Sequence, residues 1–206
     1  MGFFDILKQQ AQSALSSGIR QGVSGAAGSA MNAIRNRPQS GGDSVTFTFG
    51  SLPMSVEQLK SLPEAVLTKP HYTAALTVLA LCRYGDSPQD AVGMLNFLKG
   101  PQPLSPYEEG FLRDRLNGKA YKPFSFFDGA TPGNNYTPAQ PYRITVFAGP
   151  YSFQEAGYAK LMICSSGADA PREIKLREKP SGAQWFLWEN YLLSDIREPN
   201  ANDPWA

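Results

Sequence analysis

The residue types that carry out most nucleophilic, acid–base and metal chemistry are sparse in this chain. It has one histidine, His71, and two cysteines, Cys82 and Cys164, and neither cysteine belongs to a CxxC pair. A zinc site needs several such ligands at close spacing, so we expect no metal site and no cofactor. A pair formed by Cys164 and His71 would supply a nucleophile and a base, but no motif supports it. A hydrolase is therefore the least favoured of three functional hypotheses, and we expect His71 at the surface or as a helix-capping residue.

Side chains suited to ligand recognition gather in a long segment, residues 123–142, that is rich in aromatic, amide and proline residues. Aromatic rings and amides suit sugar or peptide ligands, which makes a carbohydrate- or peptide-binding module the second hypothesis. The alternative is that the aromatic residues pin the loop to the domain, and we favour this interpretation because loop aromatics more often pack than bind. The candidate ligand-binding residues are Asp128, Asn134, Asn135, Tyr136 and Trp188.

The first 37 residues have a different composition from the rest of the chain, with four basic residues and one acidic residue. Their apolar and small residues recur at intervals of three and four, which is the helical period. Small side chains allow another backbone to approach closely, but each glycine costs such a helix roughly 1 kcal/mol relative to alanine. We therefore predict an amphipathic helix that forms only against a partner. Its predicted docking residues are Phe3, Phe4, Leu7, Ala14, Gly18, Gly22, Ala26 and Ala30.

The leading hypothesis rests on this helix: a non-catalytic interaction domain that docks to a protein partner, to a second copy, or weakly to a membrane surface. Nucleic-acid binding is not expected, because the net charge is only +1 and charged residues make up 18% of the chain. The longest mainly apolar stretch, Ala74 to Cys82, is far shorter than the ~20 residues of a membrane-spanning helix. The first residues lack the basic, apolar and small-residue pattern of a secretory signal, so we expect none. We expect a cytoplasmic protein, in part peripheral to the inner face of the membrane.

The elements that must position these residues come after a short predicted linker, residues 38–43, and form one predicted α+β domain, residues 44–206. Alternation around Phe47 predicts a strand, and helices are expected from about Val56, Pro88 and Pro106, with a buried central helix over 70–84. Capping serines precede three of these helices. They are Ser55, Ser87 and Ser105.

From residue 142 onward the apolar period changes to two, and turn residues separate four such stretches. The gaps between the stretches are too short for the crossovers that parallel strands need, so we predict antiparallel pairing. A helical half followed by an antiparallel meander is an α+β fold, here with a separate N-terminal helix.

Several stretches of the domain have a recognisable pattern: 126–138, 165–169, 174–177, the QWFLWE stretch at 184–189 and the terminal DPWA at 203–206. Together they resemble an uncharacterised bacterial domain family, over roughly residue 45 to the C-terminus. The resemblance implies a bacterial cytoplasmic protein and brings no established activity, cofactor or catalytic residue.

Overall fold

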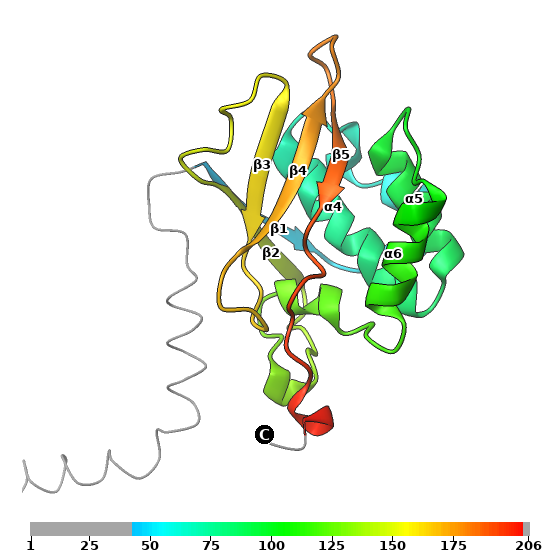
Figure 1. Ribbon diagram of the computed structural model, residues 1–206, viewed down its shortest axis with the longest axis vertical. Coiled ribbons are helices and arrows are strands. Elements are labelled where there is room, and N and C mark those ends of the chain that lie inside the picture. The colour runs from blue at the N-terminus through cyan, green and yellow to red at the C-terminus, as the bar shows by residue number, and fades with distance from the viewer. Residues whose placement is uncertain (1–42, 204–206) are drawn as a thin grey trace, which may run out of the picture. The chain divides into compact units, whose positions relative to one another are not determined.

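The computed structural model describes residues 43–203 (Figure 1). The predicted N-terminal helix, its docking residues and most of the predicted linker lie outside these residues. The described part of the chain begins at Asp43, directly before the first strand.

The domain contains one five-stranded sheet in which every neighbouring pair of strands is antiparallel. The strand order is β1-β2-β3-β4-β5, so the predicted meander over the last four strands is confirmed. The first strand joins the sheet beside β2, although the whole helical half separates the two in sequence. The strands are β1 (Ser44–Phe49), β2 (Tyr142–Ala148), β3 (Tyr158–Ile163), β4 (Arg172–Glu178) and β5 (Trp185–Asn190).

Within residues 43–203, four helices lie between β1 and β2, and short 3-10 turns stand among them, before β2 and after β5. The helices are α3 (Val56–Lys60), α4 (Pro70–Cys82), α5 (Pro88–Lys99) and α6 (Pro106–Leu116). The 3-10 turns are η1 (Pro63–Val66), η2 (Arg83–Gly85), η3 (Lys122–Phe126), η4 (Pro132–Asn134) and η5 (Asn200–Asn202). A helical half followed by a strand meander confirms the predicted α+β class.

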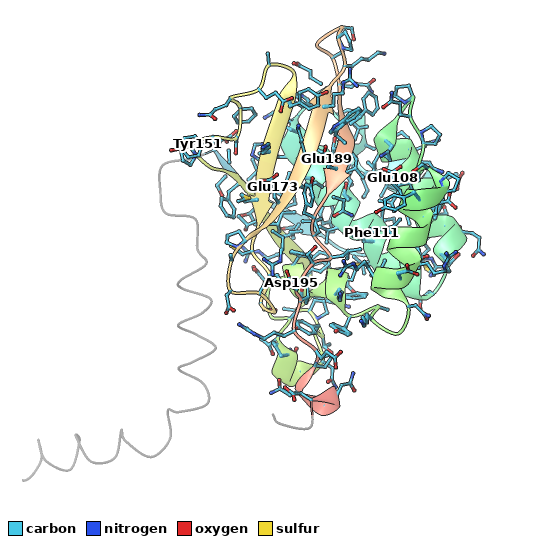
Figure 2. The ribbon with its side chains drawn as sticks, in the orientation of Figure 1. Glu108, Phe111, Tyr151, Glu173, Glu189 and Asp195 are labelled. Carbon is cyan, nitrogen blue, oxygen red and sulfur yellow. The ribbon has the colours of Figure 1, made fainter. Side chains whose placement is uncertain are left out.

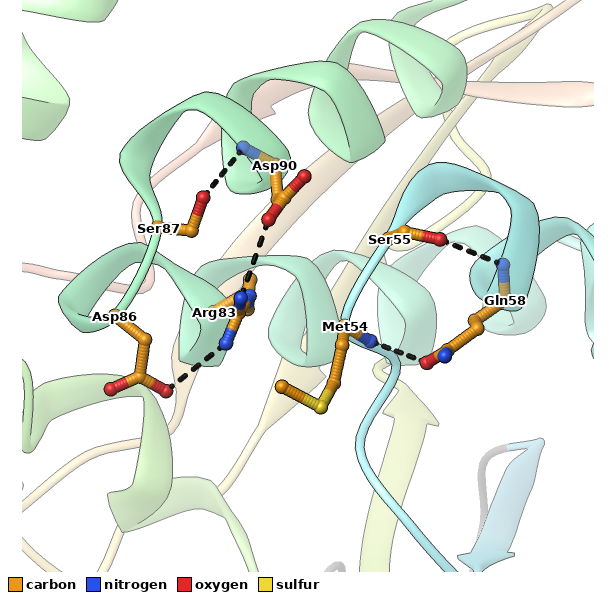
Figure 3. Close-up of polar contacts among 7 residues, drawn as sticks. All are labelled: Met54, Ser55, Gln58, Arg83, Asp86, Ser87 and Asp90. Atoms are coloured by element: carbon orange, nitrogen blue, oxygen red, sulfur yellow. Dashed lines mark hydrogen bonds and ion pairs between the residues drawn. The ribbon is translucent and has the colours of Figure 1, made fainter.

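The predicted caps explain where the helices begin. The Ser55 and Ser87 hydroxyls each accept a hydrogen bond from the backbone three residues on, as Figure 3 shows. Ser105 forms a complete capping box, because the Glu108 side chain also accepts from the Ser105 backbone at 2.8 Å. Such caps satisfy amide groups that a helix leaves without partners at its N-terminus. Arg83, also drawn in Figure 3, ties η2 to α5 by pairing with Asp86 and Asp90, each at 3.3 Å.

The core lies between the helices and one face of the sheet, and α4 is its centre. Every α4 residue except Tyr72 is buried, as the continuous apolar run predicts. The helices gather on one side of the sheet in Figure 1, where α4 contacts β2, β3, β4 and β5. Within residues 43–203, no helix is both long and apolar enough to cross a membrane.

The other face of the sheet, which we call the outer face, carries the alternate residues of each strand. Along β3, for example, Ala159, Leu161 and Ile163 are buried against the helices, whereas the intervening residues are half-buried or exposed. This is the period-two pattern of a sheet with one packed face. The outward-pointing set on β3 and β4 comprises Tyr158, Lys160, Met162, Glu173, Lys175 and Arg177.

Candidate functional site

His71 does not lie where the sequence predicts it. Its side chain is 2% exposed, in the first turn of α4, so the prediction of a surface residue is wrong. The reason is that α4 is central to the core, and even its first turn is covered. The Nε2 atom lies 3.9 Å from Asp43 Oδ2 and has no hydrogen-bond partner within residues 43–203. Burial lowers the pKa of the imidazole, more strongly than the neighbouring Asp43 raises it.

Neither cysteine has the lowered pKa of a reactive thiol: Cys82 is buried, Cys164 is half-buried, and burial raises the pKa of both. Cys82 is enclosed in α4 and Cys164 directly follows β3, and burial raises the pKa of the Cys164 thiol to about 11. A catalytic cysteine needs a lowered pKa, since the thiolate is the nucleophile. Asp43, which lies beside His71, directly precedes β1. Cys164 directly follows β3, and β2 lies between β1 and β3 in the sheet. Residues 43–203 also contain no cluster of three His, Cys, Asp or Glu side chains that could hold a metal ion.

In the aromatic loop, Asn134 organises the loop itself. Its Oδ1 accepts from the Thr131 and Thr137 backbone amides at 2.8 and 3.2 Å, and its Nδ2 donates to the Gly129 and Thr137 carbonyls. Asn135 is exposed in a left-handed conformation with φ 55°, which asparagine tolerates well. The amide that the ligand hypothesis needs at position 134 is therefore already used within the loop.

Tyr136 points inward and joins the loop to the C-terminal segment. Its side chain is 1% exposed, its ring stacks on Tyr121 at 5.4 Å, and its hydroxyl donates to the Arg197 carbonyl at 2.8 Å. Burial raises the pKa of Tyr136 to about 12. Asp128, by contrast, is exposed and lies 3.7 Å from Arg143, its carboxylate oxygen against the Arg143 Nε. This geometry is that of a pinned loop, and a ligand role for these residues stays an untested prediction.

Trp188 belongs to a cluster of aromatic and basic side chains from three strands on the outer face. It meets Tyr158 of β3 edge to face, with ring centroids 5.9 Å apart. The Arg177 guanidinium lies 4.7 Å from the Trp188 ring, and the Lys175 ammonium lies 4.3 Å from the Tyr158 ring. Both distances are within the range of favourable cation–π contacts. We call Tyr158, Lys175, Arg177 and Trp188 the aromatic–basic cluster.

A hollow of about 340 Å³ adjoins this cluster. The connection between β2 and β3 forms one wall, because Ser152 is buried there and exchanges hydrogen bonds with the Lys160 backbone and the Gly149 amide. Glu155, from the same connection, also lines the hollow and accepts from Lys175 Nζ at 2.9 Å, which raises the pKa of that lysine. Figure 2 places Tyr151 beside the sheet and Glu173 on it, away from Glu108 on α6. The lining also includes Tyr158, Lys160 and Met162.

Large apolar side chains stand out into solvent around the hollow. Tyr151 is 70% exposed, Phe153 53% and Tyr191 47%, and the Tyr191 hydroxyl donates to Glu189 on β5. Tyr151 lines the hollow, Phe153 lies between the lining residues Ser152 and Gln154, and the Tyr191 amide donates to the carbonyl of the lining residue Glu173.

A second hollow, of about 760 Å³, lies between η2, α5 and α6. Although it is larger, it contains none of the residues that the sequence analysis singled out. Its polar side chains, Gln89, Glu109, Arg113 and Asn117, surround an apolar floor that includes Val92 and Leu116. Nucleophile, base and metal ligands do not converge there, so we take the outer face as the candidate site.

Sequence reasoning found Trp188 but missed the other members of the aromatic–basic cluster. Alternation along β3 and β4 indicates that Tyr158, Lys175 and Arg177 share a face with the residues two positions away. It does not say which residues of neighbouring strands lie opposite. The register pairs Tyr158 with Arg177 and Lys175 with Glu189, and a bulge between Lys175 and Leu176 sets the position of Trp188.

The comparisons with known proteins identify a family but no activity. No curated protein and no solved structure gives a significant match to the chain. A family model described as a domain of unknown function, DUF6935, matches residues 51–200, which include all four described helices and strands β2 to β5. This match confirms the resemblance to an uncharacterised domain family, and the chain therefore belongs to the DUF6935 family.

Proposed function

We propose that this protein is a non-catalytic interaction domain and that the outer face of its sheet binds a protein partner. The observation that carries the proposal is the aromatic–basic cluster beside a hollow, with exposed aromatic side chains around it. Tyrosine, tryptophan, arginine and methionine are enriched in protein interfaces and dominate their binding energy. Tyr158, Trp188, Arg177 and Met162 supply all four types within this one region.

The charges of this region favour a protein over a nucleic acid. Lys160, Lys175 and Arg177 are matched by three glutamates, Glu155, Glu173 and Glu189. A nucleic-acid interface carries a clear excess of basic residues, because the phosphate backbone supplies most of the affinity. A surface of mixed charge with aromatic residues instead complements another protein surface of mixed charge.

The hollow supplies the place for an anchoring side chain of that partner. Its volume, about 340 Å³, is near the lower end of the roughly 300–1,000 Å³ range of ligand sites. That space suits one or two side chains better than a nucleotide or flavin cofactor. The acidic and basic groups at its rim would then form the polar border that surrounds such anchors in protein complexes.

Photocrosslinking in cells tests this proposal directly. A photoreactive phenylalanine analogue replaces Tyr151 at the hollow or, as the matched control, Tyr107 on α6, which is 82% exposed. We expect a discrete protein adduct from position 151 and none from position 107. With the crosslinked partner purified, Arg177→Ala is expected to weaken binding by about 30-fold, the size of a typical interface hot spot. Equal adducts from both positions, or an unchanged dissociation constant for Arg177→Ala, would contradict the proposal.

The N-terminal helix remains a second proposed docking element, and its residues lie outside the described part of the chain. Two full-length variants separate its two expected partners. Gly18→Leu with Gly22→Leu fills the small-residue stripe and should reduce self-association or partner docking, measured by sedimentation. Phe3→Ser with Phe4→Ser should instead reduce flotation with anionic liposomes. If neither variant differs from the parent chain, the helix has no docking role.

A further inference from the structure

The two edges of the sheet are treated differently by the rest of the domain. At the β5 edge, the Trp185 amide donates to the Leu67 carbonyl at 2.8 Å, and the Thr73 hydroxyl donates to the Trp185 carbonyl at 2.6 Å. The side-chain amide of Gln184 also donates, through Nε2, to the Val66 carbonyl. The segment before α4 thus covers the start of β5, which is how soluble proteins protect an edge strand.

At the β1 edge, the hydrogen-bonding pattern leaves a row of backbone groups open. The Ala148 amide donates to the Asp43 carbonyl at 2.8 Å, which fixes the phase of the ladder with β2. Because bonded residues alternate along an antiparallel strand, Val45, Phe47 and Phe49 face β2 and the intervening residues face outward. Within residues 43–203, no backbone group bonds to the outward N–H and C=O groups. The three outward-facing residues, Ser44, Thr46 and Thr48, are all exposed.

Strand β1 also lacks the features that keep edge strands from pairing. Its sequence, SVTFTF, contains no charged residue and no proline, and its register with β2 has no bulge. Threonine, valine and phenylalanine are strong strand formers. An uncharged, regular edge of this composition is a template for a further strand.

We propose that this edge pairs with β1 of a second copy of the chain, antiparallel and centred on Thr46, so that two sheets become one. The outward residues of one copy must face the outward residues of the other, since only they have β1 backbone groups that are not bonded to any part of residues 43–203. In the centred register Thr46 faces Thr46 and Ser44 faces Thr48, and each facing pair exchanges two hydrogen bonds. Val45 then lies opposite Phe47. From Ser44 to Thr48, each pair belongs to a favourable class: hydroxyl with hydroxyl, or β-branched with aromatic.

The composition of the chain favours a second copy over residues 1–42 as the occupant of this edge. That segment is rich in glycine and alanine, which are depleted in strands, and its apolar period is helical. The β1 sequence, in contrast, is complementary to itself in a two-fold arrangement, the commonest symmetry of soluble oligomers. The inference does not depend on the proposed function of the outer face, because it uses backbone groups at the sheet edge.

Placing a charged residue at position 46 tests the pairing in the full-length protein. Thr46 lies opposite its own copy, so Thr46→Lys and Thr46→Glu each place like charges face to face. We expect each variant alone to dimerise at least tenfold more weakly than the parent in sedimentation equilibrium at low salt, and an equimolar mixture to form a heterodimer. Thr145→Val is the matched control. It removes the same 2.8 Å hydroxyl contact between Thr46 and Thr145 but lies on β2, away from the edge, and should dimerise like the parent.

Amide hydrogen exchange supplies a second readout that does not depend on any substitution. The Ser44, Thr46 and Thr48 amides should become protected as the protein concentration rises through the dimerisation range, while the Val45 and Phe47 amides are protected throughout. A parent chain that stays monomeric at millimolar concentration would overturn the inference. So would a dimer that neither Thr46 variant weakens, because it would use another surface.

Discussion

The contact between Gly167 and Tyr136 gives a quantitative test of how the aromatic loop is held. A methyl group at Gly167 would collide with the Tyr136 hydroxyl and would lie 2.8 Å from Ile196 Cγ2. Gly167 does not have a positive φ, so a substitution there is opposed by packing rather than by backbone conformation. Gly167→Ala therefore measures how tightly the loop, the turn after β3 and the C-terminal segment are packed together.

The expected change in the free energy of unfolding differs between the two substitutions. Overpacking a well-packed interior by one methyl group costs about 1–3 kcal/mol, which is the expected effect of Gly167→Ala. Tyr136→Phe removes the hydrogen bond from the buried Tyr136 hydroxyl to the Arg197 carbonyl, at a cost of about 1 kcal/mol. Phenylalanine also removes the atom that the new methyl group would meet first. The double variant should therefore be more stable than the sum of the two effects predicts, by about 1 kcal/mol.

Urea unfolding followed by circular dichroism measures all three free energies of unfolding. Gly133→Ala is the matched control, because the nearest atom to its added methyl group is Thr131 Oγ1 at 3.9 Å. It should change stability by no more than about 0.5 kcal/mol, as surface substitutions usually do. Strict additivity of the two substitutions, or a Gly167→Ala variant as stable as the parent, would refute the packing that we describe.

Three further predictions concern single residues. Burial lowers the pKa of His71 below its ordinary value of 6.5, so on acidification the unfolded chain binds a proton before the folded one. The free energy of unfolding should therefore fall as the pH drops below 6.5. His71→Asn leaves the chain without histidine, and its free energy of unfolding, measured in urea, should lose this dependence on pH. Ser105→Ala should lower the free energy of unfolding by about 1 kcal/mol through loss of the cap, and a variant of unchanged thermal midpoint would contradict this. Lys122→Ala should cost about 2 kcal/mol in urea unfolding, because it unpairs the buried Leu193 carbonyl, whereas exposed Lys119→Ala should be neutral.

Much of the fold was predictable because its signals are local. The Ser55, Ser87 and Ser105 hydroxyls bond amides three residues away, so each helix start is specified within one turn of sequence. Strand periodicity is equally local, and the short gaps between β2 and β5 leave only antiparallel pairing. The same reasoning does not extend to burial at an element's end, and it therefore misplaced His71.

The candidate site was predictable only in part, since it depends on which strand residues lie opposite each other. The sequence marks Trp188 as unusual, but the partners Tyr158 and Arg177 come from other strands and are selected by the register. For Tyr136, two alternatives were open, and the structure shows a buried ring rather than an exposed one. That outcome depends on the C-terminal segment, whose Arg197 carbonyl is 61 residues away.

By itself, the sequence determined the helices, the strands and their antiparallel connection, because capping bonds and apolar periods act over a few residues. The position of β1 beside β2, where Thr46 meets Thr145 across 99 residues, comes only from the tertiary structure. The same holds for its outer edge, with which no other strand of residues 43–203 pairs. Contacts of this kind join residues that are far apart in sequence and depend on packing throughout the domain. No short window of residues can therefore predict them.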